Sequence, residues 1–353
     1  MANARGSFGQ RLAAALRQAF GSLFTLRPAP GPRWPIALQA SLAMAVPIAV
    51  MTVVGHPDIG YQAATGAFAA LYASNRAAID RVRVVPVVGA GLFAAAALGV
   101  WAGSSPLLTI LGLALVTLAA SAAAFGFSLG PPGPLFAVLI FGLSAHVSSV
   151  GAPAGVYLAA VAGGILLSIL ITAAPLVLAS RRRMPRHPLR ELLPGPSWSG
   201  PAGMLFLRAA IVALVGTALG IAIDPDRVYW IVGAAIAVIG TAAERQAAFH
   251  RGLHRMVGTL VGVVLYLLVA PVPITGIALA LVLGGLQFAI EIVVVRNYAL
   301  ALTFITPLVL LLTSAATGVS GSIEVASERV IDTLVGATLG AITGLLHSRA
   351  ARR

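Results

Sequence analysis

The sequence predicts an all-α integral membrane protein with about twelve transmembrane helices, built as two parallel six-helix repeats. Three observations predict this fold class. The 353 residues are 59% hydrophobic and only 9% charged, with a mean hydropathy of +0.97, whereas a water-soluble domain carries roughly 25% charged residues. A dozen long apolar runs divide the chain, and one motif recurs in its two halves. One globular core cannot bury so many apolar runs, so the surrounding medium must be lipid.

The apolar runs form two sets of six, because a span needs about 20 apolar residues, or fewer where neighbouring helices bury it. The expected spans are 35–55, 58–74, 84–102, 106–127, 134–150, 154–179, 204–223, 227–243, 256–270, 273–295, 299–318 and 328–347. The regions that follow are a basic amphipathic cytoplasmic segment 1–34, a first repeat 35–179, an Arg- and Pro-rich linker 180–203, a second repeat 204–347 and a basic tail 348–353.

The first region is expected to be an amphipathic helix on the cytoplasmic leaflet. Phe8, Leu12, Leu16 and Leu23 recur at helical spacing, with arginines on the rest of the helical wheel. A secretory signal is excluded, because the first long apolar run begins only at Pro35.

The arginines predict the orientation of the spans. All 23 basic residues are arginines, and all but Arg227 and Arg329 fall on one side of the predicted membrane. The positive-inside rule makes that side the cytoplasm, with both termini and the linker there. The absence of lysine and the high content of Ala, Gly and Pro indicate a GC-rich bacterial genome. We therefore expect a multi-pass protein of the bacterial cytoplasmic (inner) membrane.

The repeated motif lies at the start of the second span of each half. His56-Pro57-Asp58-x-x-Tyr61 reappears 168 residues later as Asp224-Pro225-Asp226-x-x-Tyr229. Since each half has an even number of spans, the copies run in the same direction and imply a pseudo-twofold axis along the membrane normal. A shared path between the halves is then expected. Proline and aspartate suit a helix start; the four residues Asp58, Tyr61, Asp226 and Tyr229 are also candidates for an outer vestibule.

Ionisable residues inside the spans are candidates for proton coupling or gating, because a charge at a helix centre costs roughly 2.5–3.5 kcal/mol on insertion scales. Glu291, Glu328 and Asp332 are such carboxylates. Their structural alternative is an ion pair, which for Asp332 is expected with Arg329 on the same helix.

His146 is expected to be a hydrogen-bonded core residue. Glycines four residues apart, among them Gly258/Gly262 and Gly336/Gly340, indicate close helix packing.

Arginines after the second span of each half are candidates for a substrate path: Arg76, Arg81, Arg83, Arg245, Arg251 and Arg255. They serve topology and attract anionic lipids, at roughly 1 kcal/mol each near the surface. A sharper hypothesis is a funnel that concentrates an organic anion, since arginine binds carboxylates through two parallel hydrogen bonds.

Several classes of function are disfavoured. The sequence has no cysteine and no hydrolase, metalloprotease or nucleotide-binding motif, so we expect neither an enzyme nor a cofactor or metal. Because the basic residues lie in the gaps between spans, they indicate topology rather than nucleic-acid binding.

Three segments of the second half resemble the fusaric acid resistance protein (FUSC) family of bacterial inner-membrane proteins. They are Glu244-Arg245 through Arg255 to Gly262, Arg296-Asn297-Tyr298 through Thr306-Pro307, and Glu328-Arg329 through Asp332 to Gly336. The first half carries a weaker copy around Tyr61. The resemblance implies efflux of aromatic carboxylic acids and a distant similarity to the plant aluminium-activated malate transporters. It adds Arg296, Asn297 and Tyr298 to the substrate-path candidates.

The leading hypothesis is therefore secondary efflux of organic, aromatic-carboxylate anions. The alternatives are a passive organic-anion channel, a major-facilitator transporter, to which Asp80-Arg81-Val-Arg83 is faintly similar, and a non-transporting membrane partner or scaffold. The expected partners are a small organic anion and the lipid bilayer, and the sequence leaves an oligomer open.

Overall fold

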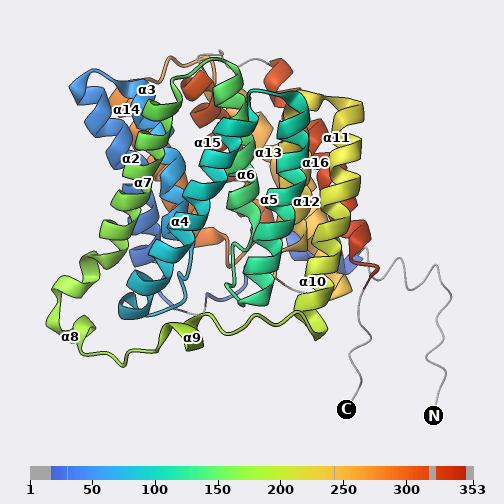
Figure 1. Ribbon diagram of the computed structural model, residues 1–353. Helices are drawn as coiled ribbons and strands as arrows, with labels where there is room; N and C mark the ends of the chain where they lie inside the picture. Colours follow the sequence, from blue (N-terminus) through green and yellow to red (C-terminus); the bar gives the residue numbers. More distant parts are fainter. Residues whose placement is uncertain (1–16, 30, 242, 318–322, 347–353) are drawn as a thin grey trace, which may run out of the picture.

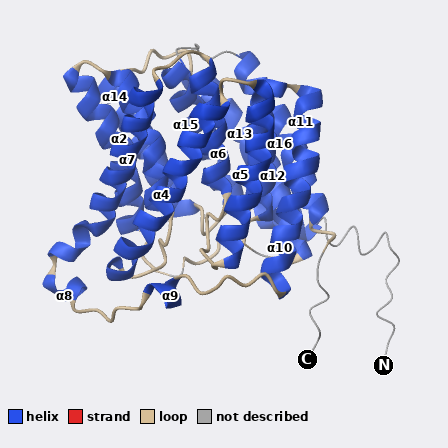
Figure 2. Cartoon of the chain, viewed as in Figure 1, coloured by secondary structure: helices blue, strands red, loops and turns tan. Residues whose placement is uncertain are grey.

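The computed structural model describes residues 17–29, 31–241, 243–317 and 323–346, and in these residues the secondary structure consists of helices joined by turns and loops, without strands. The helices stand side by side with roughly parallel axes, and the linker crosses one end of the bundle (Figures 1 and 2). The expected basic tail 348–353 and the first 16 residues of the N-terminal segment lie outside the described residues.

The first half begins with a helical segment at 17–23. Its main helices are α2 (Trp34–Val54), α3 (Pro57–Ala64) continued by the 3₁₀ helix η1 (Thr65–Leu71), α4 (Ala78–Ala102), α5 (Pro106–Gly126), α6 (Leu135–Ser149), and α7 (Ala154–Ala173) continued by η2 (Ala174–Val177). Prolines begin α3 and α5, where their missing N–H costs nothing. Gly55 ends α2 with φ +92°, and its N–H returns to the carbonyls of Met51 and Thr52.

The linker contains two one-turn helices, α8 (Ala179–Arg182) and α9 (Leu189–Leu192). The second half then consists of α10 (Gly200–Ile211), the π-helical turn η3 (Val212–Gly216), α11 (Thr217–Ile223), the turn η4 (Pro225–Arg227), α12 (Val228–Ile239), α13 (Arg245–Val269), α14 (Gly276–Val293), α15 (Tyr298–Thr317) and α16 (Ile323–Thr343).

Eight helical segments of the described chain are long and apolar enough to cross a membrane. They are Trp34–Val54, Ala78–Ala102, Pro106–Gly126, Ala154–Val177, Gly200–Ile223, Arg245–Val269, Gly276–Val293 and Tyr298–Ala316, and α6 is a shorter apolar helix. The chain is thus an all-α, multi-pass membrane protein. The other expected spans contain α3–η1, α12 and α16; the first two are short, and α16 carries charged residues in its first two turns.

The two halves interlock. Within the halves, α4 packs on α6 and α7, while α13 packs on α15 and α16. The first helix of each half reaches across to the other half: α2 packs along α14, and α10 packs on α5. The short helices α3 and α12 lie further inside, where α3 contacts α15 and α12 contacts α6. Neither half is therefore a separate domain.

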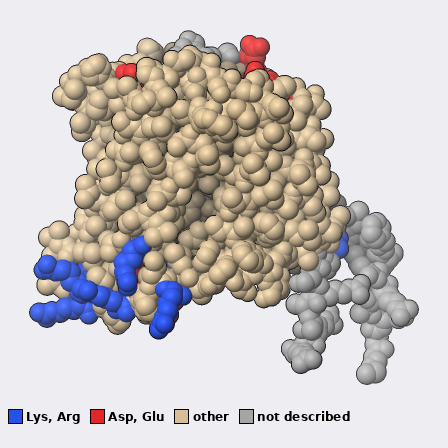
Figure 3. Space-filling view, viewed as in Figure 1, with Lys and Arg blue, Asp and Glu red and all other residues tan. Residues whose placement is uncertain are grey.

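Charged side chains separate to the two ends of the bundle. On the face seen in Figure 3, arginines gather at the linker end and acidic residues at the opposite end. The long wall between them carries neither kind of charge on this face, as expected for a surface in contact with lipid.

Glycines are placed where helices approach most closely, as their spacing predicted. A Cβ on Gly258 of α13 would lie 2.3 Å from the carbonyl oxygen of Ala299 on α15. A Cβ on Gly336 of α16 would lie 2.3 Å from the carbonyl oxygen of Ile231 on α12. Neither backbone can move away without separating the helices, so only glycine fits.

We expect Gly258→Ala to destabilise the protein by about 1–3 kcal/mol, because the added methyl group overlaps backbone atoms. Its matched control is Gly285→Ala, since a Cβ on Gly285 of α14 meets nothing within 4 Å. Thermal unfolding of both variants in detergent measures the effect. A Tm of the Gly258→Ala variant equal to that of the control would contradict the close approach.

Candidate functional site

The first-half arginines nearest the linker bind the linker itself. Arg76 Nη2 donates to the carbonyl oxygen of Leu192 at 2.9 Å, and Arg83 Nη1 donates to that of His187. The His187 ring nitrogen Nδ1 lies 2.8 Å from Oδ2 of Asp80. Two of the substrate-path candidates thus fasten the linker across the start of α4.

Arg81 on α4 is buried, and its side chain reaches α2. Its guanidinium donates to Oε1 of Gln39 at 2.5 Å and to the carbonyl oxygen of Ala70, near the end of η1, at 2.6 Å. The carboxylate of Glu291 lies close enough to Arg81 for their charges to interact. It accepts a hydrogen bond from Nη2 of Arg33 at 3.0 Å. Glu291 is therefore a paired carboxylate that joins the end of α14 to the start of α2.

Arg251 makes the matching contact in the second half. Its Nη2 atom donates to the carbonyl oxygen of Ala237, in the last turn of α12, at 2.9 Å. Carbonyls in a last helical turn have no partner within the helix, so both Arg251 and Arg81 satisfy the end of a short inner element. Arg245, at the start of α13, is exposed.

The N-terminal helical segment 17–23 is held at the linker ends of α13 and α15. Asn297 Nδ2 donates to the carbonyl oxygen of Leu23 at 2.6 Å, and the N–H of Arg27 donates to the carbonyl oxygen of Arg296 at 3.0 Å. Asn297 Oδ1 also accepts from an N–H in the first turn of α15. These two candidates therefore bind the segment that precedes α2.

A buried arginine cluster lies inside the second half, among α12, α13, α15 and α16. It consists of Arg255, Tyr298, Arg329 and Trp230. Arg255 Nη1 donates to the Tyr298 hydroxyl at 3.0 Å, and the guanidinium carbon of Arg329 lies 4.2 Å from the Trp230 ring centroid. The guanidinium of Arg251 lies over the Tyr298 ring at 4.6 Å. Arg255 and Arg329 are each 5% exposed, and their charges are close enough to interact.

The two buried arginines enter from opposite ends of the bundle. Arg255 follows the start of α13 by ten residues, or ~15 Å, and Arg329 follows the start of α16 by six residues, or ~9 Å, at 1.5 Å per residue. Both therefore lie more than one helical turn inside the bundle. The close approaches at Gly258 and Gly336, one to two turns away, bring their helices against α15 and α12.

Several donors of the cluster have no hydrogen-bond partner among the described residues: Arg255 Nε and Arg329 Nε and Nη1. The hydroxyls of Thr259 and Thr333, one turn further along α13 and α16, are also unpaired there. A buried donor left unsatisfied costs about 1–3 kcal/mol, and a charged one costs more. The cluster thus offers free donors and excess positive charge to an anion.

Asp332 does not form the ion pair expected with Arg329. It is 1% exposed, and neither of its carboxylate oxygens has a hydrogen-bond partner among the described residues. The guanidinium of Arg329 lies over Trp230 instead, a cation–π contact worth about 2 kcal/mol where water is excluded. The guanidinium thus lies against the aromatic ring of a neighbouring helix, and Asp332 stays within electrostatic reach of it without a hydrogen bond.

Glu328 belongs to an ion network at the end of the bundle that faces away from the linker. It pairs with Arg227 of η4, and Nε of Arg227 lies 3.1 Å from Oδ2 of Asp224. Asp332 is in electrostatic reach of all three groups. The network joins the starts of α12 and α16 beyond the arginine cluster.

The outer-vestibule candidates separate into two pairs. Asp226 and Tyr229 line a cavity of about 170 Å³ between α5, α6 and the start of α12. Asp58 is exposed and Tyr61 is buried at the start of α3, and neither lines this cavity. His146, expected as a hydrogen-bonded core residue, lines the cavity, and no side-chain hydrogen bond of it occurs among the described residues.

Sequence reasoning missed Arg329 and Trp230 as site residues. In the sequence, Arg329 stands out only as an exception to the positive-inside count, and Trp230 directly follows the repeated motif. The available signal was that an arginine deep in an apolar run is a functional candidate by itself.

One of the comparisons with known proteins concerns this same half. Residues 209–343 match the family model described as fusaric acid resistance protein-like, a range that contains the whole arginine cluster. The chain is 31% identical over 150 residues to the uncharacterized membrane protein YvaC of Bacillus subtilis (strain 168). That alignment covers 42% of this chain and 24% of YvaC, so it spans about a quarter of that relative's length. No solved structure matches the chain.

The membrane-protein relative and the many apolar helices agree on a multi-pass membrane protein. The resemblance seen in the sequence is thus confirmed over residues 209–343, which match the fusaric acid resistance protein-like family.

Proposed function

We propose that this protein is a secondary exporter of organic anions, aromatic carboxylates in particular, and that the arginine cluster binds the anion on its way. The observation that carries the proposal is the pair of buried guanidiniums, Arg255 and Arg329, with free N–H donors and interacting like charges.

The chemistry of the cluster suits an aromatic carboxylate. Two like charges buried in an apolar bundle repel each other and have lost hydration, so a bound anion stabilises both. The planar guanidinium matches the two oxygens of a carboxylate. The rings of Tyr298 and Trp230, which already face Arg251 and Arg329, offer aromatic surface beside those donors.

The proposed path runs within the second half, although the sequence suggested a path between the halves. Arg251 lies at its linker end, the arginine cluster in its middle, and Asp332 beyond the cluster. The Arg227–Glu328–Asp224 network then closes the far end as a gate. Asp332, which is buried and has no hydrogen-bond partner among the described residues, lies between the gate and the cluster. Its carboxylate would take up and release the proton whose movement is coupled to that of the anion.

Around this path we propose twelve spans in two parallel six-helix repeats, with both termini and the linker in the cytoplasm of a bacterial inner membrane. Equivalent packing in the two halves supports the repeat: α4 on α6 and α7 corresponds to α13 on α15 and α16, and α2 on α14 corresponds to α10 on α5. The short α3–η1 and α12 are extensively buried by neighbouring helices, so they need not match the full thickness of the lipid.

Arg255→Gln is expected to lower the flux of an aromatic carboxylate such as benzoate about 10- to 100-fold, because a hydrogen bond to a charged group contributes about 1.5–3 kcal/mol. The assay is uptake into sealed vesicles that contain the purified protein. The matched control is Arg245→Gln, which removes an exposed arginine from the same helix and is expected to retain the wild-type flux within about twofold. Equal flux in both variants would contradict a role of the cluster.

Asp332→Asn is expected to abolish the acceleration of flux by a pH gradient and to leave downhill flux in place, because an amide cannot carry the proton. Initial rates with and without the gradient measure this coupling. Glu324→Gln, at an exposed position of the same helix, is the control. A wild-type protein that moves the anion only downhill, whatever the pH gradient, would instead be a passive anion channel.

The proposed topology is testable because the chain has no cysteine. A membrane-impermeant maleimide is expected to label a Ser104→Cys variant, between α4 and α5, in intact cells. The same reagent is expected to label a Ser197→Cys variant, in the linker, only in inverted vesicles. Labelling of both variants from one side would contradict the topology.

A further inference from the structure

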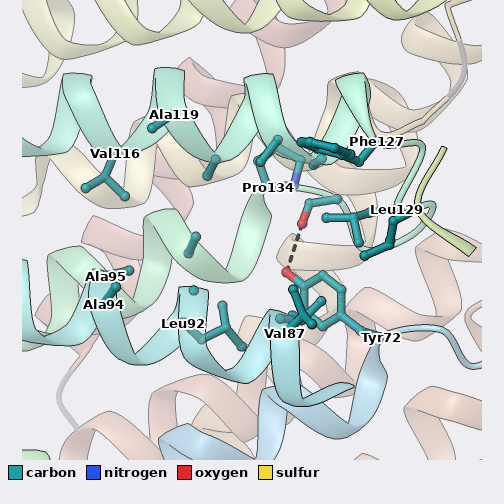
Figure 4. Close-up of a pocket in the computed structure, with 18 of the residues that line it drawn as sticks. Tyr72, Val87, Leu92, Ala94, Ala95, Val116, Ala119, Phe127, Leu129 and Pro134 are labelled. Atoms are coloured by element: carbon teal, nitrogen blue, oxygen red, sulfur yellow. Dashed lines mark hydrogen bonds between the residues drawn. The ribbon is translucent and has the colours of Figure 1, made fainter. Parts of the chain in front are cut away.

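An apolar groove runs along the outside of the first half, between α4 and α5, with α6 as its floor (Figure 4). Its volume is about 620 Å³. Small residues open it: Gly91, Ala94 and Ala95 on α4 face Ala119, Ala120 and Ala123 on α5. The bundle surface is visibly hollowed where these helices stand side by side (Figure 3).

The groove is polar at one end only. Apart from Tyr72 and Arg190, every lining residue is apolar or glycine. The Tyr72 hydroxyl is already used, because it donates to the carbonyl oxygen of Gly133 at 2.8 Å (Figure 4). Arg190 is therefore the charged group that a molecule in the groove would meet.

The linker holds Arg190 at the mouth of the groove. Arg190 lies on α9 beside Leu189 and Leu193, which also line the groove. On one side of the groove, Arg76, just before α4, donates to the carbonyl oxygen of Leu192. On the other side, Nε1 of Trp198 in the linker donates to the carbonyl oxygen of Ala122 on α5 at 3.1 Å. Both walls of the groove are thus hydrogen-bonded to the linker segment that carries Arg190.

We propose that this groove binds an acyl chain of an anionic phospholipid, with the phosphate of the headgroup at Arg190. The walls extend from Val87 to Leu98 on α4, eleven residues or ~16 Å at 1.5 Å per residue. That length is about half of the roughly 30 Å hydrocarbon core, which is the depth of one leaflet. Both walls belong to helices that are apolar enough to span the membrane, and basic residues at this level of a membrane protein bind anionic headgroups.

Lipid binding in the groove is independent of the proposed transport function. The groove lies on α4, α5 and α6 of the first half, whereas the arginine cluster lies on α12, α13, α15 and α16. Loss of lipid binding and loss of anion flux are therefore separate outcomes.

The test is native mass spectrometry of the purified full chain in detergent, titrated with phosphatidylglycerol or with phosphatidylcholine. We expect one phosphatidylglycerol retained per chain in preference to phosphatidylcholine. Ala120→Trp, which fills the groove, is expected to abolish this retention. Arg190→Gln is expected to weaken phosphatidylglycerol binding about fivefold, the worth of one arginine near an anionic headgroup, and to leave phosphatidylcholine unaffected.

The controls are Leu115→Trp, on the exposed side of α5, and Arg182→Gln, elsewhere in the linker; both are expected to bind like wild type. If the Ala120→Trp protein has a lowered Tm, Ala94→Phe fills the groove from the opposite wall. If the protein retained both lipids equally, with arginine or glutamine at position 190, the retained lipid would be the nonspecific lipid that surrounds any membrane protein. That result would overturn the proposal. Displacement of the lipid by benzoate, or a dimer that Ala120→Trp dissociates, would assign the groove to the substrate or to a second copy instead.

Discussion

The cost of keeping an arginine inside an apolar bundle determines how this protein is organised. A guanidinium that leaves water must recover its hydrogen bonds from the protein. Arg81 and Arg251 recover them from the carbonyl ends of η1 and α12, and so fix these short inner elements to the long helices α4 and α13. Arg208 is fully buried; its Nε donates to the hydroxyl of Thr343, and its two Nη atoms have no hydrogen-bond partner among the described residues.

Seen in this way, the arginines divide into two kinds. Arg76, Arg83 and Arg33 are used by the fold, because each binds a carbonyl or a carboxylate of another segment. Arg255 and Arg329 are only partly satisfied, by a phenol and an indole ring. A protein that retains unsatisfied buried charges at a stability cost gains from them elsewhere, and binding of an anion is the use that fits their chemistry.

The sequence predicted the long helices well, because apolar length is a local property. The expected span 106–127, for example, corresponds to Pro106–Gly126. The partners of the charged residues could not be predicted in the same way, since they come from distant segments: Arg33 pairs with Glu291, and His187 with Asp80. The spacing of Arg329 and Asp332 on one helix likewise predicts an ion pair, but the Arg329 guanidinium lies over Trp230 of another helix, which spacing along one helix does not reveal.

The packing of α2 along α14 has a consequence for how the chain is made. Gly284 on α14 lies against Ser41 and Ala45 of α2, and the Arg33–Glu291 pair closes the same contact. A ribosome delivers α2 to the membrane long before α14 exists. During that interval the partner face of α2 is covered only by lipid or by an insertion factor. Tertiary assembly is therefore completed late in synthesis, and a chain that stops at the linker cannot bury its first helix correctly.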